Sequence, residues 1–345
     1  MKNKKVIVLG RLKSCFFETM AKKNIQIQQW DSRTAIPEEQ LRQWLSGAEG
    51  LILGRGSGGR KKLTVNGQLL EMGPFLKVVA QDLAGYDNVT VRDCTDAGIP
   101  FGNAAGANAE SVAEEAMGLV YMTARRMIEA WNFVRDGRWA AYAVPPEGVN
   151  LMGRTAGIVG IGAIGQAFAR RAEASGMHII YHARTVHPDA EGHGWHWRDM
   201  DRLLAESDVI VSATPLTPAT HQMWNRSCFQ KMKDTAFFIN VGRGGCVKTE
   251  DLTEALLSGS LAGAALDVVD PEPIPPDHPL LRTGRCIVLP HMGSMTEETL
   301  SEMSRETAEN VLEGLKGKPL PGIVNPEVYG TEQFKNKWAG EGKND

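Results

Sequence analysis

Short runs of hydrophobic residues recur along the chain, separated by longer stretches in which apolar and polar residues mix. The first hundred residues contain KVIVLG, GLILG and KVVAQ, and the part after Gly153 contains TAGIVG, HIIYHA, DVIVSAT, AFFINVG, AGAALDVV and CIVLP. Near-continuous apolar runs are typical of strands covered on both faces, and their alternation with helix-like stretches is typical of parallel sheets. The pattern therefore predicts an α/β fold with two sheet-forming regions.

One long helix is predicted before the second sheet-forming region and another after it. The first spans residues 108–139, where apolar residues recur at spacings of three and four. The second begins at Ser294, with Glu297 three residues later at the spacing of a capping box, and ends at Gly317. The remaining residues 334–345 are expected to form a solvated tail.

This order of elements predicts the domain organisation. A chain that builds one sheet, passes through a long helix into a second sheet and ends on another long helix leaves its first domain and later returns to it. We therefore expect residues 1–104 and 296–345 to form one discontinuous domain, with residues 105–295 as an inserted domain. The chain stops soon after NPEVY, so no additional regulatory domain is expected.

The charge balance gives no sign of a polyanionic partner. The 345 residues include 38 basic and 41 acidic side chains, a formal net charge of -3, and no basic stripe that would neutralise a nucleic-acid backbone. No window approaches the ~18 apolar residues that span a bilayer. The five cysteines are odd in number and lack metal-ligand spacing. We therefore expect a cytoplasmic protein without nucleic-acid, membrane or metal partners.

The segment GIGAIG carries the clearest functional signal. Gly160, Gly162 and Gly165, with Ala163 and Ile164 between them, directly follow the run TAGIV and precede a helix-like stretch. In a dinucleotide-binding turn the first glycine allows a tight turn, the second lets the backbone approach the pyrophosphate, and the third lets helix and strand pack closely. The context predicts a Rossmann dinucleotide-binding domain, against the alternative of a glycine-rich surface turn.

The end of the next run, IIYHART, bears on the choice of cofactor. NAD-binding domains place an acidic residue there to hydrogen-bond the adenosine ribose, but His182 stands at this position, 22 residues after Gly160. Arg184 and Thr185 follow, and a guanidinium can pair bidentately with a 2′-phosphate. We therefore expect NADP to be preferred, with NAD as the alternative. The competing interpretations are a solvated cation for Arg184 and a passive replacement for His182.

Three further stretches each place a chemically active side chain at or just past a predicted strand end. They are NVGRGG with Arg243, DVVDPEP with Glu272 and LPHMGS with His291. In open α/β sheets ligands bind outside the carboxyl ends of the strands, so residues far apart in sequence can converge on one crevice. Taken singly, Glu272 and His291 fit structural roles equally well. Together, the three stretches indicate one site.

These stretches together resemble the D-isomer-specific 2-hydroxyacid dehydrogenases. GANAESVAE, LMGRTAGIVGIGAIGQ, TPLTPATHQM, FINVGRGG, ALDVVDPEP and PHMGS occur in the family's order, and the resemblance covers residues 76–329. It implies a Rossmann domain inserted into a discontinuous flavodoxin-like substrate domain, a small-molecule 2-oxoacid substrate and a homodimer. The chain departs from the family at Ala163, where Arg is frequent, at Glu115, where His is frequent, and at His182.

The resemblance also implies roles for individual residues. Arg243 would bind the substrate carboxylate and polarise its carbonyl, His291 would give a proton to the carbonyl oxygen, and Glu272 would keep His291 charged and oriented. The implied cofactor groove includes Thr214, Pro215, Val241, Gly242 and Asp267, the last facing the nicotinamide carboxamide. The implied substrate contacts are the backbone amides of Leu83, Ala84 and Gly85, together with Trp139, whose alternative role is a packed aromatic at a helix end.

The resulting expectation is an NAD(P)-dependent 2-hydroxyacid dehydrogenase that works as a glyoxylate/hydroxypyruvate-type reductase with NADPH. Residues 54–60, GRGSGGR, are expected to be a lid or a basic contact for a larger acid. One alternative is therefore a D-3-phosphoglycerate dehydrogenase-like enzyme without a regulatory domain. Another is a dinucleotide-sensing, corepressor-like binding protein; turnover of simple 2-oxoacids would favour the enzyme, and tight NAD(H) binding without turnover would favour the sensor. Formate-dehydrogenase-like oxidation is disfavoured, because it would not need Glu272 and His291.

Overall fold

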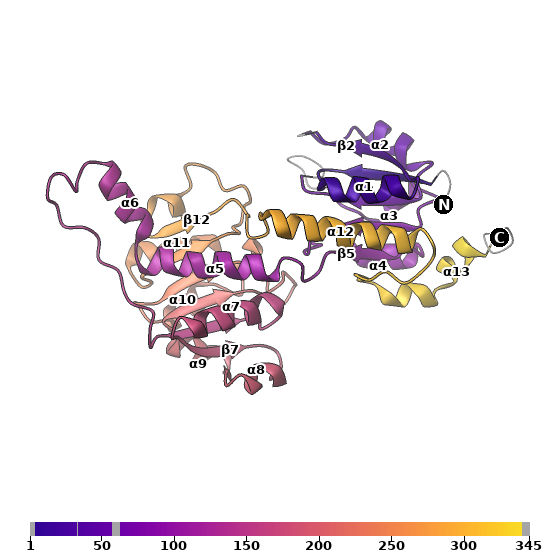
Figure 1. Ribbon diagram of the computed structural model, residues 1–345. Coiled ribbons are helices and arrows are strands. Elements are labelled where there is room, and N and C mark those ends of the chain that lie inside the picture. Colours follow the sequence, from indigo (N-terminus) through magenta and orange to yellow (C-terminus); the bar gives the residue numbers. More distant parts are fainter. Residues whose placement is uncertain (1–3, 33, 57–62, 340–345) are drawn as a thin grey trace. The chain divides into compact units, whose positions relative to one another are not determined.

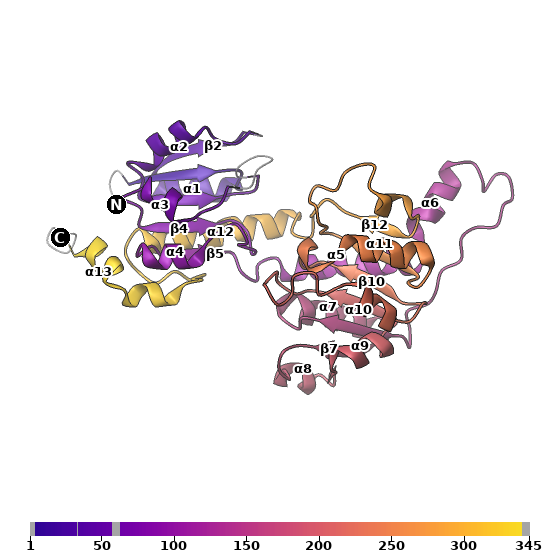
Figure 2. The same ribbon diagram turned by 180° about the vertical axis from the view of Figure 1, so that it is seen from behind.

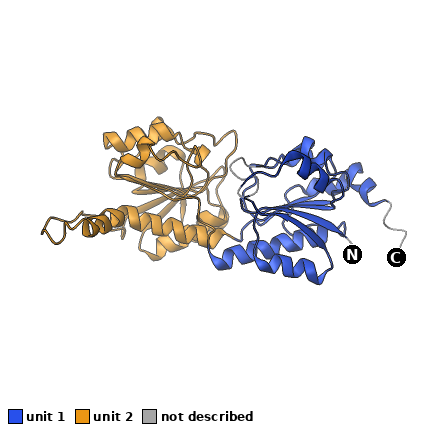
Figure 3. Ribbon diagram, turned by 90° about the horizontal axis from the view of Figure 1, so that it is seen from above, with its two compact units in different colours: residues 1–107, 296–345 blue, residues 108–295 orange. Residues whose placement is uncertain are grey.

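The computed structural model describes residues 4–32, 34–56 and 63–339. The chain divides into unit 1, Met1–Ala107 and Thr296–Asp345, and unit 2, Asn108–Met295 (Figure 3). Each unit contains one parallel sheet with helices (Figures 1 and 2). The expected lid or basic contact at residues 54–60 lies largely outside the described residues. None of the described helices combines the length and apolar character needed to cross a membrane.

Unit 1 is built on a five-stranded sheet in the order β2-β1-β3-β4-β5, which is the flavodoxin-like order. Its strands are β1 (Lys5–Leu9), β2 (Gln26–Trp30), β3 (Gly50–Leu53), β4 (Val78–Gln81) and β5 (Phe101–Asn103). Its helices are α1 (Ser14–Lys22), α2 (Glu38–Leu45), α3 (Gly67–Glu71), α4 (Val91–Asp96), α12 (Glu297–Gly314) and α13 (Glu332–Trp338). Unit 1 is thus assembled from two segments that are far apart in the sequence.

Strand β1 illustrates why the strands are continuous apolar runs. Val6 and Val8 belong to one buried cluster, whereas Ile7 and Leu9 belong to another. Successive side chains point to opposite faces of a strand, so a sheet covered on both faces needs apolar residues at every position. Helices α1 and α12 contribute to the first cluster, and α2, α3 and α4 contribute to the second.

Unit 2 contains a seven-stranded sheet in the order β12-β11-β10-β9-β6-β7-β8. Its strands are β6 (Thr155–Val159), β7 (His178–His182), β8 (His196–Trp197), β9 (Val209–Ser212), β10 (Phe237–Asn240), β11 (Gly263–Leu266) and β12 (Cys286–Val288). The strand order reverses between the neighbours β6 and β9, which is the topological switch point of a doubly wound sheet. The expected α/β fold with a Rossmann-type sheet is confirmed.

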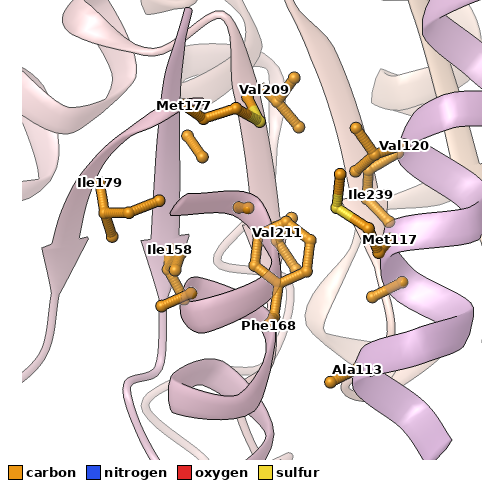
Figure 4. Packing of buried hydrophobic residues seen from close by; sticks show 14 of the residues in the cluster. Ala113, Met117, Val120, Ile158, Phe168, Met177, Ile179, Val209, Val211 and Ile239 are labelled. Carbon is orange, nitrogen blue, oxygen red and sulfur yellow. The ribbon is translucent and has the colours of Figure 1, made fainter. Parts of the chain in front are cut away.

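The helices of unit 2 are α5 (Ala109–Ala124), α6 (Met127–Arg135), α7 (Ala163–Ala174), α8 (Pro188–Gly192), α9 (Met200–Glu206), α10 (Arg226–Lys231) and α11 (Thr249–Ser258). Helices α5, α7 and α9 pack against the sheet, whereas α6 follows α5 and extends away from the sheet (Figure 1). Figure 4 shows Ala113, Met117 and Val120 of α5 beside Phe168 of α7 and Ile239 of β10. The three-and-four spacing along α5 therefore corresponds to a buried helix face.

The prediction of a single helix over residues 108–139 is wrong. α5 ends at Ala124, and α6 begins after Arg126, whose φ of 50° is left-handed. A left-handed residue interrupts a right-handed helix, and here neither Gly nor Pro marks the break. The apolar spacing continues into α6, but Trp131 and Val134 are exposed there. The periodicity correctly predicted helical structure in both segments, but it wrongly predicted that they form one continuous helix.

The start of the second long helix also differs from the prediction. Thr296, rather than Ser294, is the N-cap of α12, because its Oγ1 accepts a hydrogen bond from the Thr299 N–H at 3.2 Å. Both residues are suitable capping types. The local backbone, which the sequence does not specify, decides between them.

The expected solvated tail begins with a docked helix instead. In α13, the ring of Trp338 lies against Gly317, where a Cβ would come within 2.7 Å of Cδ2. The ammonium groups of Lys4 and Lys77 lie 5.7 and 4.9 Å from the same ring, within range of a cation–π interaction. One aromatic side chain therefore anchors the segment, while residues 340–345 lie outside the described part of the chain.

Candidate active site

The glycine loop joins β6 to α7 at the switch point of the unit 2 sheet. Gly160 has a φ of 96°, and a Cβ there would lie 2.8 Å from the Ala213 carbonyl oxygen. A Cβ on Gly165 would lie 2.1 Å from the Gly160 carbonyl oxygen, whereas one on Gly162 would meet no described atom within 4 Å. The first and third glycines therefore permit close packing, and the second leaves an open approach.

The N-terminus of α7 opens onto this loop. Gly162 is the N-cap and has no side chain to accept hydrogen bonds from the first turn, so N–H groups at Ala163 and Ile164 remain for another acceptor. These donors and the helix dipole favour an anion at this position. The arrangement fits the pyrophosphate of a dinucleotide.

The segments after β9 and β10 lie beside the glycine loop. A Cβ on Gly242 would lie 2.6 Å from the Thr214 carbonyl oxygen, and a Cβ on Gly160 would lie 3.2 Å from Thr214 Cγ2. The Thr220 hydroxyl donates to the Pro215 carbonyl oxygen at 2.7 Å, which holds the segment after β9. The structure thus brings Gly160, Thr214 and Gly242 together at the carboxyl ends of three neighbouring strands.

The end of β7 carries an imidazole with a defined partner. Nδ1 of His182 lies 2.9 Å from the Arg198 carbonyl oxygen and therefore donates to it. The ring also lies near Trp197, with 6.1 Å between the centroids. Arg184 and Thr185 follow on the surface, and Arg184 forms no ion pair with any residue that the structure describes. Its guanidinium is available to an anion.

The turn NVGRGG is held by Asn240, whose side chain is fully buried. Its Nδ2 donates to the Arg243 carbonyl oxygen at 3.0 Å, and its Oδ1 accepts from the Gly242 N–H at 3.2 Å. A Cβ on Gly244 would lie 2.2 Å from the Val269 carbonyl oxygen. These contacts fix the backbone on both sides of Arg243, whose Nη1 donates to the Gly242 carbonyl oxygen at 2.7 Å.

The segments after β11 and β12 bring Glu272 and His291 together. Nδ1 of His291 lies 2.8 Å from Oε1 of Glu272, which makes Nδ1 the donor and leaves Nε2 for another partner. The two side chains are 42% and 36% exposed, so a ligand can reach the ring. His291 has a left-handed φ of 57°, an uncommon conformation that occurs at functional sites. The pair can hold a proton at Nε2 and deliver it.

Asp267 ties the segment containing His291 to the end of β11. Its carbonyl oxygen accepts from the His291 N–H at 2.9 Å. Its side chain, 3% exposed, accepts from the Met292 N–H at 2.6 Å and from the Gly293 N–H at 3.0 Å. Three hydrogen bonds to one residue therefore fix the backbone at and after His291. The sequence did not indicate this structural role.

The expected substrate contacts lie in other parts of the chain. Leu83, Ala84 and Gly85 follow β4 in unit 1, and their carbonyl oxygens all accept hydrogen bonds from the protein. Their N–H groups have no acceptor among the residues described here, so they can bind an anion. Trp139 lies in the segment after α6, and its side chain is 70% exposed rather than packed.

Two residues near the site were not assigned a role there from the sequence. Asn240 ends an apolar run with a polar side chain, and Glu115 places an acidic residue between the buried helix positions Val112 and Leu119. A polar residue in an otherwise buried pattern is the signal that could have found both, because such groups are retained where they have a partner or a function.

Comparisons with known proteins agree with one another. A family model described as "D-isomer specific 2-hydroxyacid dehydrogenase, NAD binding domain" matches residues 117–293. The human glyoxylate reductase/hydroxypyruvate reductase is 39% identical over 299 residues, covering 86% of this chain and 90% of the human protein. A glyoxylate reductase from Korarchaeum cryptofilum is 40% identical over 267 residues, covering 76% of this chain and 80% of that protein.

Solved structures show the same similarity. A glyoxylate reductase from Paecilomyes thermophila has a TM-score of 0.85 at 27% identity, covering 95% of this chain and 99% of that one. An NADPH-dependent glyoxylate/hydroxypyruvate reductase from Sinorhizobium meliloti, solved in complex with NADP and malonate, has a TM-score of 0.81 at 28% identity, covering 93% of this chain and 96% of that one. At these coverages the similarity includes both units.

Proposed function

Because the chain belongs to the D-isomer specific 2-hydroxyacid dehydrogenase family, we propose that it reduces small 2-oxoacids of the glyoxylate and hydroxypyruvate type to 2-hydroxyacids. The protein is an NAD(P)-dependent oxidoreductase acting on CH–OH groups. The observation that carries the proposal is the Glu272–His291 pair, 2.8 Å apart, on the sheet that also bears the glycine loop. A proton donor and a dinucleotide loop on one sheet are what carbonyl reduction requires.

The proposed cofactor site uses the glycine loop and the two segments beside it. Its fit is supported by the open approach at Gly162, the free N–H groups of α7 and the close packing of Gly160 against the end of β9. The residues that would hold the dinucleotide are Gly160, Gly162, Ala163, Ile164, Gly165, Thr214, Pro215, Val241, Gly242 and Asp267. When bound, the dinucleotide supplies the hydride.

The remaining chemistry falls to three side chains. Arg243, on its fixed turn, would bind the substrate carboxylate through the planar fork of its guanidinium. His291 would hold a proton at Nε2 and give it to the carbonyl oxygen. Glu272, hydrogen-bonded to Nδ1, would orient the ring with Nε2 toward the substrate. The left-handed backbone at His291 is compatible with this role, since strain of this kind persists where surrounding contacts over-determine it.

For the cofactor, we propose a preference for NADPH over NADH. The end of β7 presents His182, whose Nδ1 is already used by the Arg198 carbonyl oxygen, instead of an acidic residue. The available guanidinium of Arg184 and the hydroxyl of Thr185 are suited to a 2′-phosphate. The reductase from Sinorhizobium meliloti was itself solved with NADP.

Changing His182 to Asp is expected to shift the ratio of kcat/KM values for NADPH and NADH toward NADH by about 10–100-fold. A carboxylate there accepts hydrogen bonds from the ribose hydroxyls of NADH and repels a 2′-phosphate. Initial rates, followed by the absorbance of the reduced nicotinamide with each cofactor, give the ratio. The matched control is Arg184→Ala, which should weaken NADPH alone. A native protein that already prefers NADH would contradict the cofactor proposal.

Turnover with a small panel of oxoacids tests the proposed substrate class. Purified protein is expected to oxidise NADPH with glyoxylate and hydroxypyruvate and to be slower with phosphorylated 3-carbon oxoacids. Faster turnover of the phosphorylated acid would instead favour a phosphoglycerate dehydrogenase-like activity. Dinucleotide binding without turnover of any oxoacid would contradict the reductase proposal and favour a sensor.

The segment around α6 supports a homodimer. Its exposed apolar side chains include Trp131, Val134, Trp139, Tyr142 and Val144. Apolar residues gathered in this way on a surface are typical of protein interfaces, so we propose that a second copy of the chain covers them. Light scattering that gave the mass of one chain, 37.6 kDa, would contradict the proposal. No disulfide joins any of the five cysteines, all of which lie in the described part of the chain, which supports the cytoplasm as the proposed compartment.

A further inference from the structure

A second carboxyl group stands beside Asp267 in unit 2. It belongs to Glu115, which lies on α5 three residues after Val112 and therefore on the same face. A Cβ at Gly293 would lie 2.8 Å from Glu115 Oε2, 3.1 Å from Val112 Cγ2 and 3.2 Å from Asp267 Oδ2. The two carboxyl groups thus converge on Gly293, two residues after His291.

The two carboxyl groups have different surroundings. Asp267 accepts hydrogen bonds from the N–H groups of Met292 and Gly293, one on each carboxylate oxygen. Both oxygens of Glu115 are buried, and no protein group among the described residues donates to either. A buried carboxylate without a donor is costly, whereas a neutral carboxyl group can donate its own O–H to Asp267. The geometry therefore favours the neutral acid at Glu115.

The basic side chains of α6 and α7, which pack against α5, form ion pairs with carboxylates other than Glu115. Those of α7 and of the α6 region form the ion pairs Arg170–Glu110, Arg171–Glu110, Arg171–Glu114, Arg126–Glu129 and Arg135–Asp136. Strands β10, β11 and β12 contain no charged residue, and His291 is bound to Glu272. Burial, followed by the charge and hydrogen bonding of Asp267, raises the pKa of Glu115 to about 8.

We propose that Glu115 is a positioning residue for His291, an inference that rests on the proposed role of His291 as the proton donor. The neutral carboxyl group of Glu115 donates a hydrogen bond to Asp267, and Asp267 holds the N–H groups of Met292 and Gly293. One proton therefore links α5 to the loop that presents the imidazole. When this proton is lost, two negative charges face each other at Gly293, and the loop loosens.

The pH dependence of 2-hydroxyacid oxidation tests this proposal, because ionisation of Glu115 is expected to loosen the loop that presents His291 and so to lower the rate as the pH rises. We expect kcat/KM of the native protein to fall by up to about tenfold between about pH 7 and 9. Glu115→Gln, whose amide stays neutral and still donates, should show no such fall.

The matched control is Glu114→Gln. Glu114 is the exposed neighbour of Glu115, paired with Arg171 on the outer face of α5, so this variant should follow the native pH profile. An alkaline fall in Glu115→Gln equal to that of the native protein would overturn the proposal. So would a loss of activity in Glu115→Gln that was the same at every pH, because a merely structural role predicts that result.

Thermal unfolding gives a readout that does not need turnover, so failure of the proposed function and failure of this inference are distinguishable. The pKa of Glu115 is raised from 4.5 to about 8 by folding, so its contribution to stability is complete below about pH 4.5 and lost as pH rises toward 8. The Tm of Glu115→Gln should therefore rise relative to the native protein by about 3–6 °C between about pH 5 and 9. A constant difference would overturn the proposal.

Discussion

Replacement of His291 by alanine is expected to lower kcat for 2-oxoacid reduction by about 10²–10⁴-fold while leaving dinucleotide binding intact. The imidazole is held by Glu272 through Nδ1, so in the proposed reaction its Nε2 would give a proton to the carbonyl oxygen. Without the ring, that proton has to come from water. Steady-state kinetics with NADPH and glyoxylate measure the rate, and the fluorescence of bound NADPH measures the affinity.

Two further variants make the His291 test specific. His178 is exposed at the opposite end of β7, so His178→Ala should have little effect. Glu272→Gln keeps the imidazole but replaces the carboxylate that accepts the hydrogen bond from Nδ1. Its kcat should therefore fall less than that of His291→Ala. A His291→Ala variant that retained most of the native rate would show that another group donates the proton.

Replacement of Arg243 by alanine is expected to lower kcat/KM for the 2-oxoacid by about 10²–10³-fold, the cost of leaving a hydrogen-bonded anion without its partner. Arg243→Lys should recover only a minor part of this loss, because an ammonium group cannot reproduce the bidentate pairing of a guanidinium with a carboxylate. The effect is expected chiefly in KM for the oxoacid. Varying each substrate at a fixed concentration of the other separates the two KM values.

The matched control for this test is Arg226→Lys. Arg226 is an exposed arginine that pairs with Glu254, outside the proposed site, so its replacement should leave both KM values unchanged. If Arg243→Lys kept the native KM for the oxoacid while KM for NADPH rose, Arg243 would be a cofactor residue instead. The turn held by Asn240 should keep the backbone in place in either Arg243 variant.

Strands were predictable from the sequence where both faces of the sheet are covered. In β9, Val209 and Val211 pack into one cluster and Ile210 into another, so the run is apolar at every position. Strand β2 escaped prediction because QIQQW lies at the edge of the unit 1 sheet and is only partly buried. Its conformation depends on pairing with β1, and the residues of β2 alone do not indicate that pairing.

The parts of the site also differ in how well the sequence predicts them. The glycine loop was predictable because its requirements are local, as the left-handed Gly160 and the contact of Gly165 with the preceding turn show. That Glu272 and His291 meet follows from the pairing of β11 with β12, which the rule about strand ends anticipated. The Glu115 contact was not predictable, since it depends on which face of α5 meets the loop after β12. The spacing of residues within α5 does not predict which face of the helix contacts that loop.

The two-segment construction of unit 1 also has a consequence for synthesis on the ribosome. Val6, Val8 and Val78 share a buried cluster with Val311 and Leu315, which belong to or follow α12. Between the two segments the ribosome must make all of Asn108–Met295, which takes on the order of 10–40 s at translation rates of about 5–20 residues per second. During that interval one face of the first sheet is covered only by α1, whereas unit 2 is continuous and can fold as it emerges. A nascent chain stalled before α12 would therefore present an apolar sheet face of the kind that chaperones and neighbouring chains bind.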